Sequence, residues 1–244
     1  MRLSALGLAV AWAALVAGGS AFGQPAQRRA VVELFTSQGC SSCPPADAVF
    51  EQYAKRDDVI ALSFSVHYWD NLGWKDTLAS PQFTYRQKAY SKARSDGQVY
   101  TPQVVVNGAA HVVGSDQSAV EDAVKASRSG AAATWVPLKL TRTGAEVVIE
   151  AAGQDGASVD TTIWLATVTR KIDVAVKRGE NAGRNLTYFN VVRSFDKIGT
   201  YAGKAVTFRI DAKVVDQAEI DGLVALMQAP HGGPIIGATT LAMK

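Results

Sequence analysis

The sequence predicts an α/β domain over residues 28–130, followed by an all-β, sandwich-like domain over residues 134–244. Three observations support this division. Hydrophobic runs with strand and helix spacing alternate as far as Arg128, in the order β-α-β-α-β-β-α. From Trp135 onward, short strands are separated by glycine-rich turns, which is typical of a β-sandwich. The only two cysteines of the chain form Cys40-Ser41-Ser42-Cys43, between the first predicted strand and the first predicted helix.

A Cys-x-x-Cys pair that joins a strand to a helix is typical of thioredoxin-like redox domains. The predicted element order is also that of the thioredoxin fold. Two independent features therefore indicate an α/β thioredoxin-like first domain.

The elements of the first half follow from spacing and from end signals. Ser80 and Pro81 are typical of a helix N-cap and first turn, and Asn107-Gly108 is a strong hairpin signal. We expect Ser115 to cap the last helix. The predicted elements are a strand at 30–35, a helix from about 46 to 56, a strand at 59–66, a helix at 81–94, strands at 103–106 and 109–113, and a helix to about 128.

The second half contains apolar segments of strand length and no convincing helical pattern. The predicted strands lie at 136–140, 147–150, 162–168, 188–192, 205–210, 223–228 and 236–241.

Residues 1–23 have the features of a secretory signal peptide. Met1-Arg2 is a positive start, an apolar run follows, and Ala21-Phe22-Gly23 offers small residues for cleavage. We therefore expect a periplasmic or secreted protein, with no stable membrane span after signal removal. Export would place the cysteine pair in an oxidising compartment. The formal net charge of +3 gives no electrostatic argument for nucleic acid.

The cysteine pair leaves three interpretations open. As a redox dithiol, Cys40 would be the nucleophile and Cys43 the resolving thiol, and protein thiols or disulfides would be the partners, with no cofactor. As a metal site, for example for Cu(I), the two thiolates would act with His67 as a third ligand. As a non-catalytic module, the protein would bind a partner without turnover. A purely structural disulfide is a weaker interpretation, because closing a loop this short removes little conformational entropy from the unfolded chain.

Two prolines complicate the activation of Cys40. Pro44 and Pro45 disfavour helical geometry in the residue before each. The helix is therefore expected to start late, with Cys43 near the N-cap. Its dipole would then act on Cys40 from a distance and lower the thiol pKa only modestly.

Several short motifs occur along the chain, in segments 33–47, 68–70, 72–76, 86–87 with Tyr90, 99–108, 178–181 and 233–238. In these segments the chain resembles a bacterial family of exported thioredoxin-like proteins of unknown function. One departure is Ser65-Val66-His67, where the family pattern has His-Val-Asp.

The resemblance implies that Pro102 follows a cis peptide bond and that the Thr101-Pro102 backbone pairs with substrate. In such a sheet the strand that starts at residue 103 runs antiparallel to the first strand, so Pro102 would lie against the cysteines. Glu33, an acid in an apolar strand, is a candidate proton relay for Cys43, or else it faces solvent or pairs with a basic group. The segment that follows the second strand is expected to line the substrate groove or to form a packed aromatic corner. Its residues are His67, Tyr68, Trp69, Asp70 and Trp74.

Overall fold

A computed structural model describes residues 29–129, 135–154 and 160–243. The predicted signal peptide and most of the predicted domain junction lie outside these residues. No helix within the described ranges combines the length and apolar character needed to cross a membrane.

The first half has the predicted element order. Strand β1 (Ala30–Thr36) is central, parallel to β2 (Val59–Ser65) and antiparallel to β3 (Gln103–Val106), which forms a hairpin with β4 (Ala110–Val113). Asn107 and Gly108 both have positive φ in the hairpin turn, as the Asn-Gly signal predicts.

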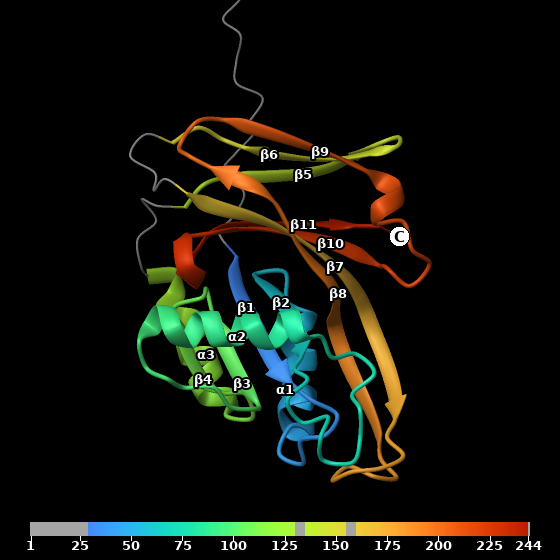
Figure 1. The fold of residues 1–244 in the computed structure, drawn as a ribbon. Coiled ribbons are helices and arrows are strands. Elements are labelled where there is room, and N and C mark those ends of the chain that lie inside the picture. Colours follow the sequence, from blue (N-terminus) through green and yellow to red (C-terminus); the bar gives the residue numbers. More distant parts are fainter. Residues whose placement is uncertain (1–28, 130–134, 155–159, 244) are drawn as a thin grey trace, which may run out of the picture.

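Helices cover both faces of this part of the sheet (Figure 1). Helices α1 (Pro44–Ala54) and α3 (Gln117–Ser129) pack on the face that carries Val32 and Leu34. Helix α2 (Pro81–Arg94) packs on the opposite face. Since successive residues of a strand point to opposite faces, neighbouring residues of β1 face different helices.

The helix ends follow local chemistry. Cys43 is the N-cap of α1, as predicted, but the helix starts at Pro44 and not at about residue 46, so the two prolines occupy its first turn. Ser80 caps α2 by accepting a hydrogen bond from the Gln82 N–H. The predicted Ser115 cap is wrong by one residue, because the Asp116 carboxylate accepts from the Ala119 N–H at 2.9 Å.

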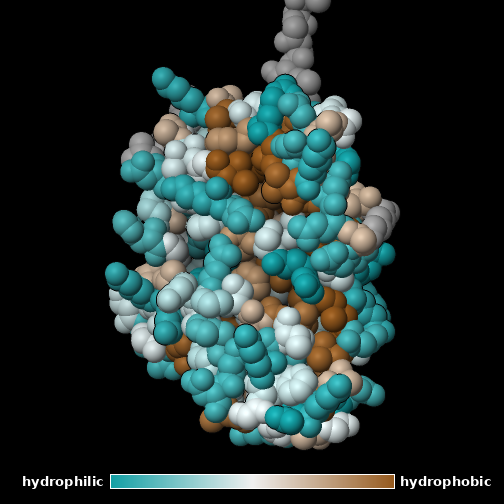
Figure 2. All heavy atoms as spheres, turned by 45° about the vertical axis from the view of Figure 1, so that its right-hand side comes forward, coloured by the Kyte–Doolittle hydropathy of each residue, from teal (hydrophilic) through white to brown (hydrophobic). Residues whose placement is uncertain are grey.

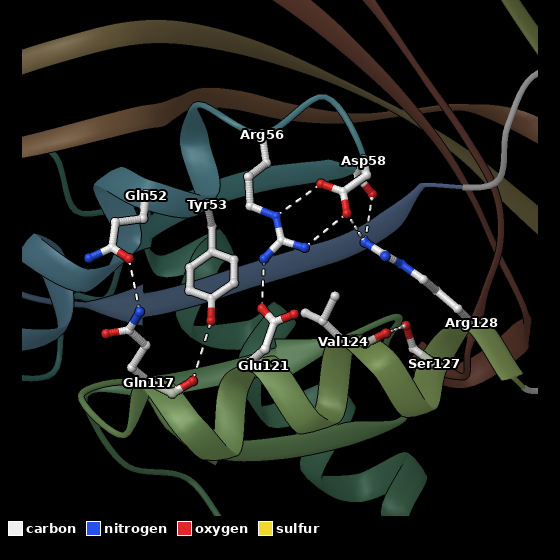
Figure 3. A network of polar contacts seen from close by, with 9 residues as sticks. All are labelled: Gln52, Tyr53, Arg56, Asp58, Gln117, Glu121, Val124, Ser127 and Arg128. Carbon is white, nitrogen blue, oxygen red and sulfur yellow. Dashed lines mark hydrogen bonds and ion pairs between the residues drawn. The ribbon is translucent and has the colours of Figure 1, made fainter.

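A polar network joins the end of α1 to α3 (Figure 3). Arg56 forms ion pairs with Asp58 at 2.8 Å and with Glu121 at 2.6 Å, and Arg128 also binds Asp58. This network fixes the C-terminal end of α1, while its N-terminal end carries the cysteines.

The second half does not form a separate sandwich. Strands β7 (Thr161–Ala175), β8 (Asn185–Tyr201), β10 (Gly222–Gln228) and β11 (Ile235–Ala242) extend the first sheet. The result is one eight-stranded sheet in the order β11-β10-β7-β8-β2-β1-β3-β4. The junction is a parallel pairing of β8 with β2, so the predicted boundary does not divide the sheet.

The remaining strands, β5 (Leu138–Thr143), β6 (Glu146–Ala151) and β9 (Val206–Asp211), form a three-stranded sheet. It packs against β7, β10 and β11 around an apolar cluster that includes Ile149 and Leu223. Figure 2 shows hydrophobic side chains in the upper part of the molecule, at the height where the two sheets face each other. The sandwich-like layering is therefore present, but one layer continues the first sheet.

The hairpin β7–β8 is much longer than predicted. Its strands have 15 and 17 residues, and the apolar pattern detected only the segments 162–168 and 188–192. Beyond Thr169, exposed Arg170, Lys171 and Asp173 interrupt that pattern. This outer arm runs beside α1, and its turn reaches the cysteine end of the sheet (Figure 1).

Candidate functional site

Cys40 and Cys43 form a disulfide between the end of β1 and the start of α1. Their Cα atoms are 5.4 Å apart, and both residues have 0% exposure. Reagents can therefore reach these sulfurs only if the surrounding groups move.

The Thr101–Pro102 peptide bond is cis, as expected, and the Thr101 carbonyl faces the hydroxyl of Ser42, which lies between the two cysteines in the chain. The Ser42 hydroxyl lies 3.3 Å from Cys40 Sγ and donates a long, 3.5 Å hydrogen bond to the Thr101 carbonyl. The antiparallel pairing of β3 with β1 thus brings the two predicted segments together.

Trp69 borders this site. Its indole N–H donates to Thr101 Oγ1 at 2.8 Å, and its Cβ would lie only 3.0 Å from a Cβ added to Gly39. Tyr68 packs beside Trp69, and burial raises the pKa of its phenol. These aromatic residues lie where the sequence predicted them.

The other residues of that segment have supporting contacts. Trp74 donates to Gln38 Oε1 at 2.8 Å, and Asp70 accepts from the Asp76 N–H at 3.1 Å. The His67 ring bonds Thr84 Oγ1 of α2 at 2.7 Å. No group of three His, Cys, Asp or Glu residues in the described part of the chain is placed to hold a metal. His67 therefore does not complete a metal site with the cysteines.

Glu33 is buried on the face that α2 covers. It forms a 2.7 Å ion pair with Arg86 and also accepts a hydrogen bond from the Tyr90 hydroxyl. Burial opposes the charge of Arg86, but Glu33 and Tyr90 together outweigh it, and the pKa of Arg86 is raised. Both carboxylate oxygens of Glu33 are engaged on this face, and α1 lies on the other. The position of Glu33 does not match a proton relay, and the pairing alternative is found instead.

Asp47 is the acid that lies on the cysteine side. It is 6% exposed in α1, one helical turn after Cys43, and residues four apart share a helix face. Thr36 donates to its Oδ1 at 2.8 Å, while Oδ2 has no hydrogen-bond partner. Burial raises the pKa of Asp47 to about 8. The sequence signal was an acid at a stripe position three residues before the buried Phe50.

A second acid supports the loop before the cysteines. Asp76 accepts hydrogen bonds from the N–H groups of Gln38 and Leu78, both at 2.8 Å. Burial raises its pKa to about 6 despite these bonds. Burial, followed by the charges of Asp47 and Asp76, also raises the pKa of Tyr188. The region behind the disulfide is therefore acidic and shielded from solvent.

The turn between β7 and β8 is fixed to the cysteine loop. Buried Asn181 donates from Nδ2 to the carbonyls of Gln38 at 3.0 Å and Cys40 at 2.9 Å. The adjacent Glu180 accepts a 3.1 Å hydrogen bond from the Ser41 N–H. Both residues lie in the resemblance segment 178–181, but the sequence assigns them no role, because contacts between residues 139 to 143 positions apart leave no local pattern.

Residues 31–228 match the family model described as "Protein of unknown function (DUF1223)". The chain belongs to this family. No curated protein is significantly similar in sequence to it. The crystal structure of protein AGR_C_4864 from Agrobacterium tumefaciens is similar, with 34% identity and a TM-score of 0.78, covering 90% of this chain and 96% of that one. HBP35 of Porphyromonas gingivalis shares the fold at 14% identity and a TM-score of 0.57, over 88% and 75% of the two chains.

The DUF1223 chain thus combines a disulfide, an adjacent cis-prolyl segment and a buried acid with a pKa of about 8. A disulfide can accept two electrons and two protons to become a dithiol. An acid with this pKa can exchange a proton near neutral pH. The arrangement is chemically suited to thiol–disulfide exchange.

Proposed function

We propose that this protein is an exported thiol–disulfide oxidoreductase with a thioredoxin-like first half, acting on protein thiols or disulfides in the periplasm or outside the cell. The observation that carries the proposal is the Cys40–Cys43 disulfide, which the Ser42 hydroxyl connects to the cis Thr101–Pro102 segment. The signal-peptide pattern supports export.

In the reducing direction, the Cys40 thiolate attacks a substrate disulfide. A Cys40–substrate S–S bond forms while the substrate S–S bond breaks, and one substrate thiolate leaves and takes a proton from water. Cys43 then attacks Cys40 Sγ and expels the second substrate sulfur. The protein ends as the Cys40–Cys43 disulfide, and the substrate gains two electrons and two protons. The oxidising direction is the reverse.

Asp47 is the proposed proton acceptor for Cys43. It lies one turn further along α1, and its Oδ2 is free of other hydrogen-bond partners. A pKa of about 8 makes it basic enough to accept a proton and acidic enough to return it near neutral pH. Asp47→Asn should therefore slow the resolving step about tenfold or more.

The cis-prolyl segment is the proposed substrate-binding element. The Trp69 bond to Thr101 fixes this segment, and Trp69 with Tyr68 and Trp74 is proposed to border the substrate groove. Because both sulfurs are buried, a substrate must displace covering groups before exchange begins.

Trapping of mixed disulfides tests the proposal. Cys43→Ala leaves Cys40 without its resolving partner, so a periplasmic extract should yield mixed disulfides at Cys40 that mass spectrometry can identify. Cys40→Ser is the matched control and should trap none. Wild-type protein should also catalyse insulin reduction by dithiothreitol, and Cys40→Ser should not. Absence of both trapping and catalysis, in variants shown to be folded, would leave the non-catalytic interpretation.

A further inference from the structure

The turn between β7 and β8 places a carboxylate at the cysteine loop. Glu180 Oε2 accepts the Ser41 N–H at 3.1 Å, immediately after Cys40 in the chain. Asn181 holds the turn in this position through its two bonds to the loop carbonyls, and Arg184 donates to Asn181 Oδ1 at 3.0 Å. The turn is therefore fixed at the loop by several contacts.

A backbone N–H group that donates to a thiolate favours it, and the Ser41 N–H, two residues before the Cys43 N-cap of α1, adjoins Cys40 in the chain. Here the Ser41 N–H is directed at a carboxylate, so it is not free to donate to Cys40 Sγ. The same carboxylate adds a negative charge next to the position where the Cys40 thiolate forms. Both effects act against the thiolate.

We propose that Glu180 suppresses the Cys40 thiolate and thereby keeps the dithiol strongly reducing. The thiolate exists only in the reduced protein, so a group that disfavours it disfavours the reduced state. The exchange equilibrium then shifts toward the disulfide, which means a more negative reduction potential. Glu180 is a positioning residue in this role. The inference concerns the same two thiols as the proposed function, but it does not require a protein substrate.

Other charged or titratable groups face the cysteine loop and also affect the stability of the Cys40 thiolate. Asp47 on α1 and Asp76 in the loop after β2 act in the same direction as Glu180 when ionised. Tyr188 on β8 has a raised pKa and is neutral near pH 7. Arg184 adds a positive charge behind Asn181. Since Glu180 is exposed, solvent screening limits its effect to a modest one.

The test compares Glu180→Gln, which keeps an oxygen acceptor and removes the charge, with wild type. Glu51→Gln is the matched control, because Glu51 is a carboxylate of α1 that pairs with Lys55. After reduction with dithiothreitol, thiolate absorbance near 240 nm gives the pKa of Cys40. Equilibration with glutathione buffers from pH 6 to pH 10 gives the reduction potential.

We expect Glu180→Gln to lower the pKa of Cys40 and to favour the dithiol about 3-fold above that pKa, or about 14 mV. Below both pKa values the two proteins should converge, since neither dithiol is then ionised. Added salt at 1 M should shrink the difference, and a merely structural role would show no such dependence on pH or salt. Glu51→Gln should match wild type.

Equal pKa values for Cys40 in wild type and Glu180→Gln would overturn the inference. The absorbance titration needs no exchange partner, so it decides the inference even if insulin reduction and trapping fail. Conversely, if Glu180→Gln lowers the pKa of Cys40 as expected but no substrate is trapped, the result would count against the proposed function alone.

Discussion

Two buried carboxylates lie on opposite faces of the sheet around β1, and they differ in their partners. Glu33 lies on the α2 face and binds Arg86 and Tyr90. Asp47 lies on the α1 face with one hydrogen bond from Thr36 and one free oxygen. Both are nearly inaccessible to solvent, with exposures of 0% and 6%. Both acids are therefore buried, but only Glu33 is paired with a cation.

This difference determines what each acid can do. A buried acid that is paired with a cation and held by further hydrogen bonds joins structural elements. A buried carboxyl without a cation binds its proton more tightly, which is the property that proton transfer requires. The paired acid is structural, and the unpaired acid beside the disulfide is the candidate for chemistry.

The largest effect on the free energy of unfolding is expected from removing the cation of the Glu33–Arg86 pair. Arg86→Met would leave Glu33 buried without its cation, and such changes cost about 3–5 kcal/mol of unfolding free energy. Urea unfolding measures this loss. The double variant Glu33→Gln/Arg86→Met removes both charges and should recover much of it. A single variant within about 1 kcal/mol of wild type would show that the pairing matters less than we infer.

A smaller effect is expected at Asn181, which satisfies two buried carbonyls next to Cys40. Asn181→Ala leaves the Gln38 carbonyl without this donor, while the Cys40 carbonyl keeps the Cys43 N–H at 3.2 Å, so the expected cost is about 1–3 kcal/mol. Hydrogen exchange should show that the β7–β8 turn has loosened, and alkylation of the reduced protein should be faster at Cys40. Asn185→Ala, at the exposed start of β8, is the control and should change neither measurement. Unchanged protection from hydrogen exchange in Asn181→Ala would contradict the inference that Asn181 holds the β7–β8 turn at the cysteine loop.

Local chemistry explains why the first half of the fold was predictable. The Ser80-Pro81 start of α2 and the Asn107-Gly108 turn are set by neighbours in sequence, and both appear as predicted. The merged sheet was not predictable in this way. It depends on β8 pairing with β2 through Ser63 and Val191, and no local pattern encodes such a contact.

The site was predictable to the same extent. Cys40, Cys43 and Pro102 belong to short motifs, and the structure brings them together. The sequence favoured Glu33 and did not single out Asp47, because an acid inside an apolar strand is a stronger local signal than an acid in a helix. The position of Arg86, 53 residues away, decides the matter, and only the folded chain shows it.

The unpaired side of the comparison is tested by the pH dependence of stability. Asp47 has its folded-state pKa raised to about 8 by burial, from an ordinary value near 3.8. Between these values the unfolded chain releases the proton and the folded chain keeps it, so stability falls as pH rises. Asp47→Asn lacks this loss. Relative to wild type, it should gain stability steadily from pH 5 to pH 8, with a slope of at most about 1.4 kcal/mol per pH unit.

Asp173→Asn supplies the control for that measurement. Asp173 is an exposed acid of β7 whose pKa is lowered, first by its hydrogen bond from Thr187 and then by Lys171. Because its shift has the opposite sign, its replacement should bring no gain with rising pH. If Asp47→Asn follows the control instead, Asp47 is ionised in the folded protein near neutral pH. The contrast between a paired and an unpaired acid would then fail, and with it the assignment of Asp47 as proton acceptor for Cys43.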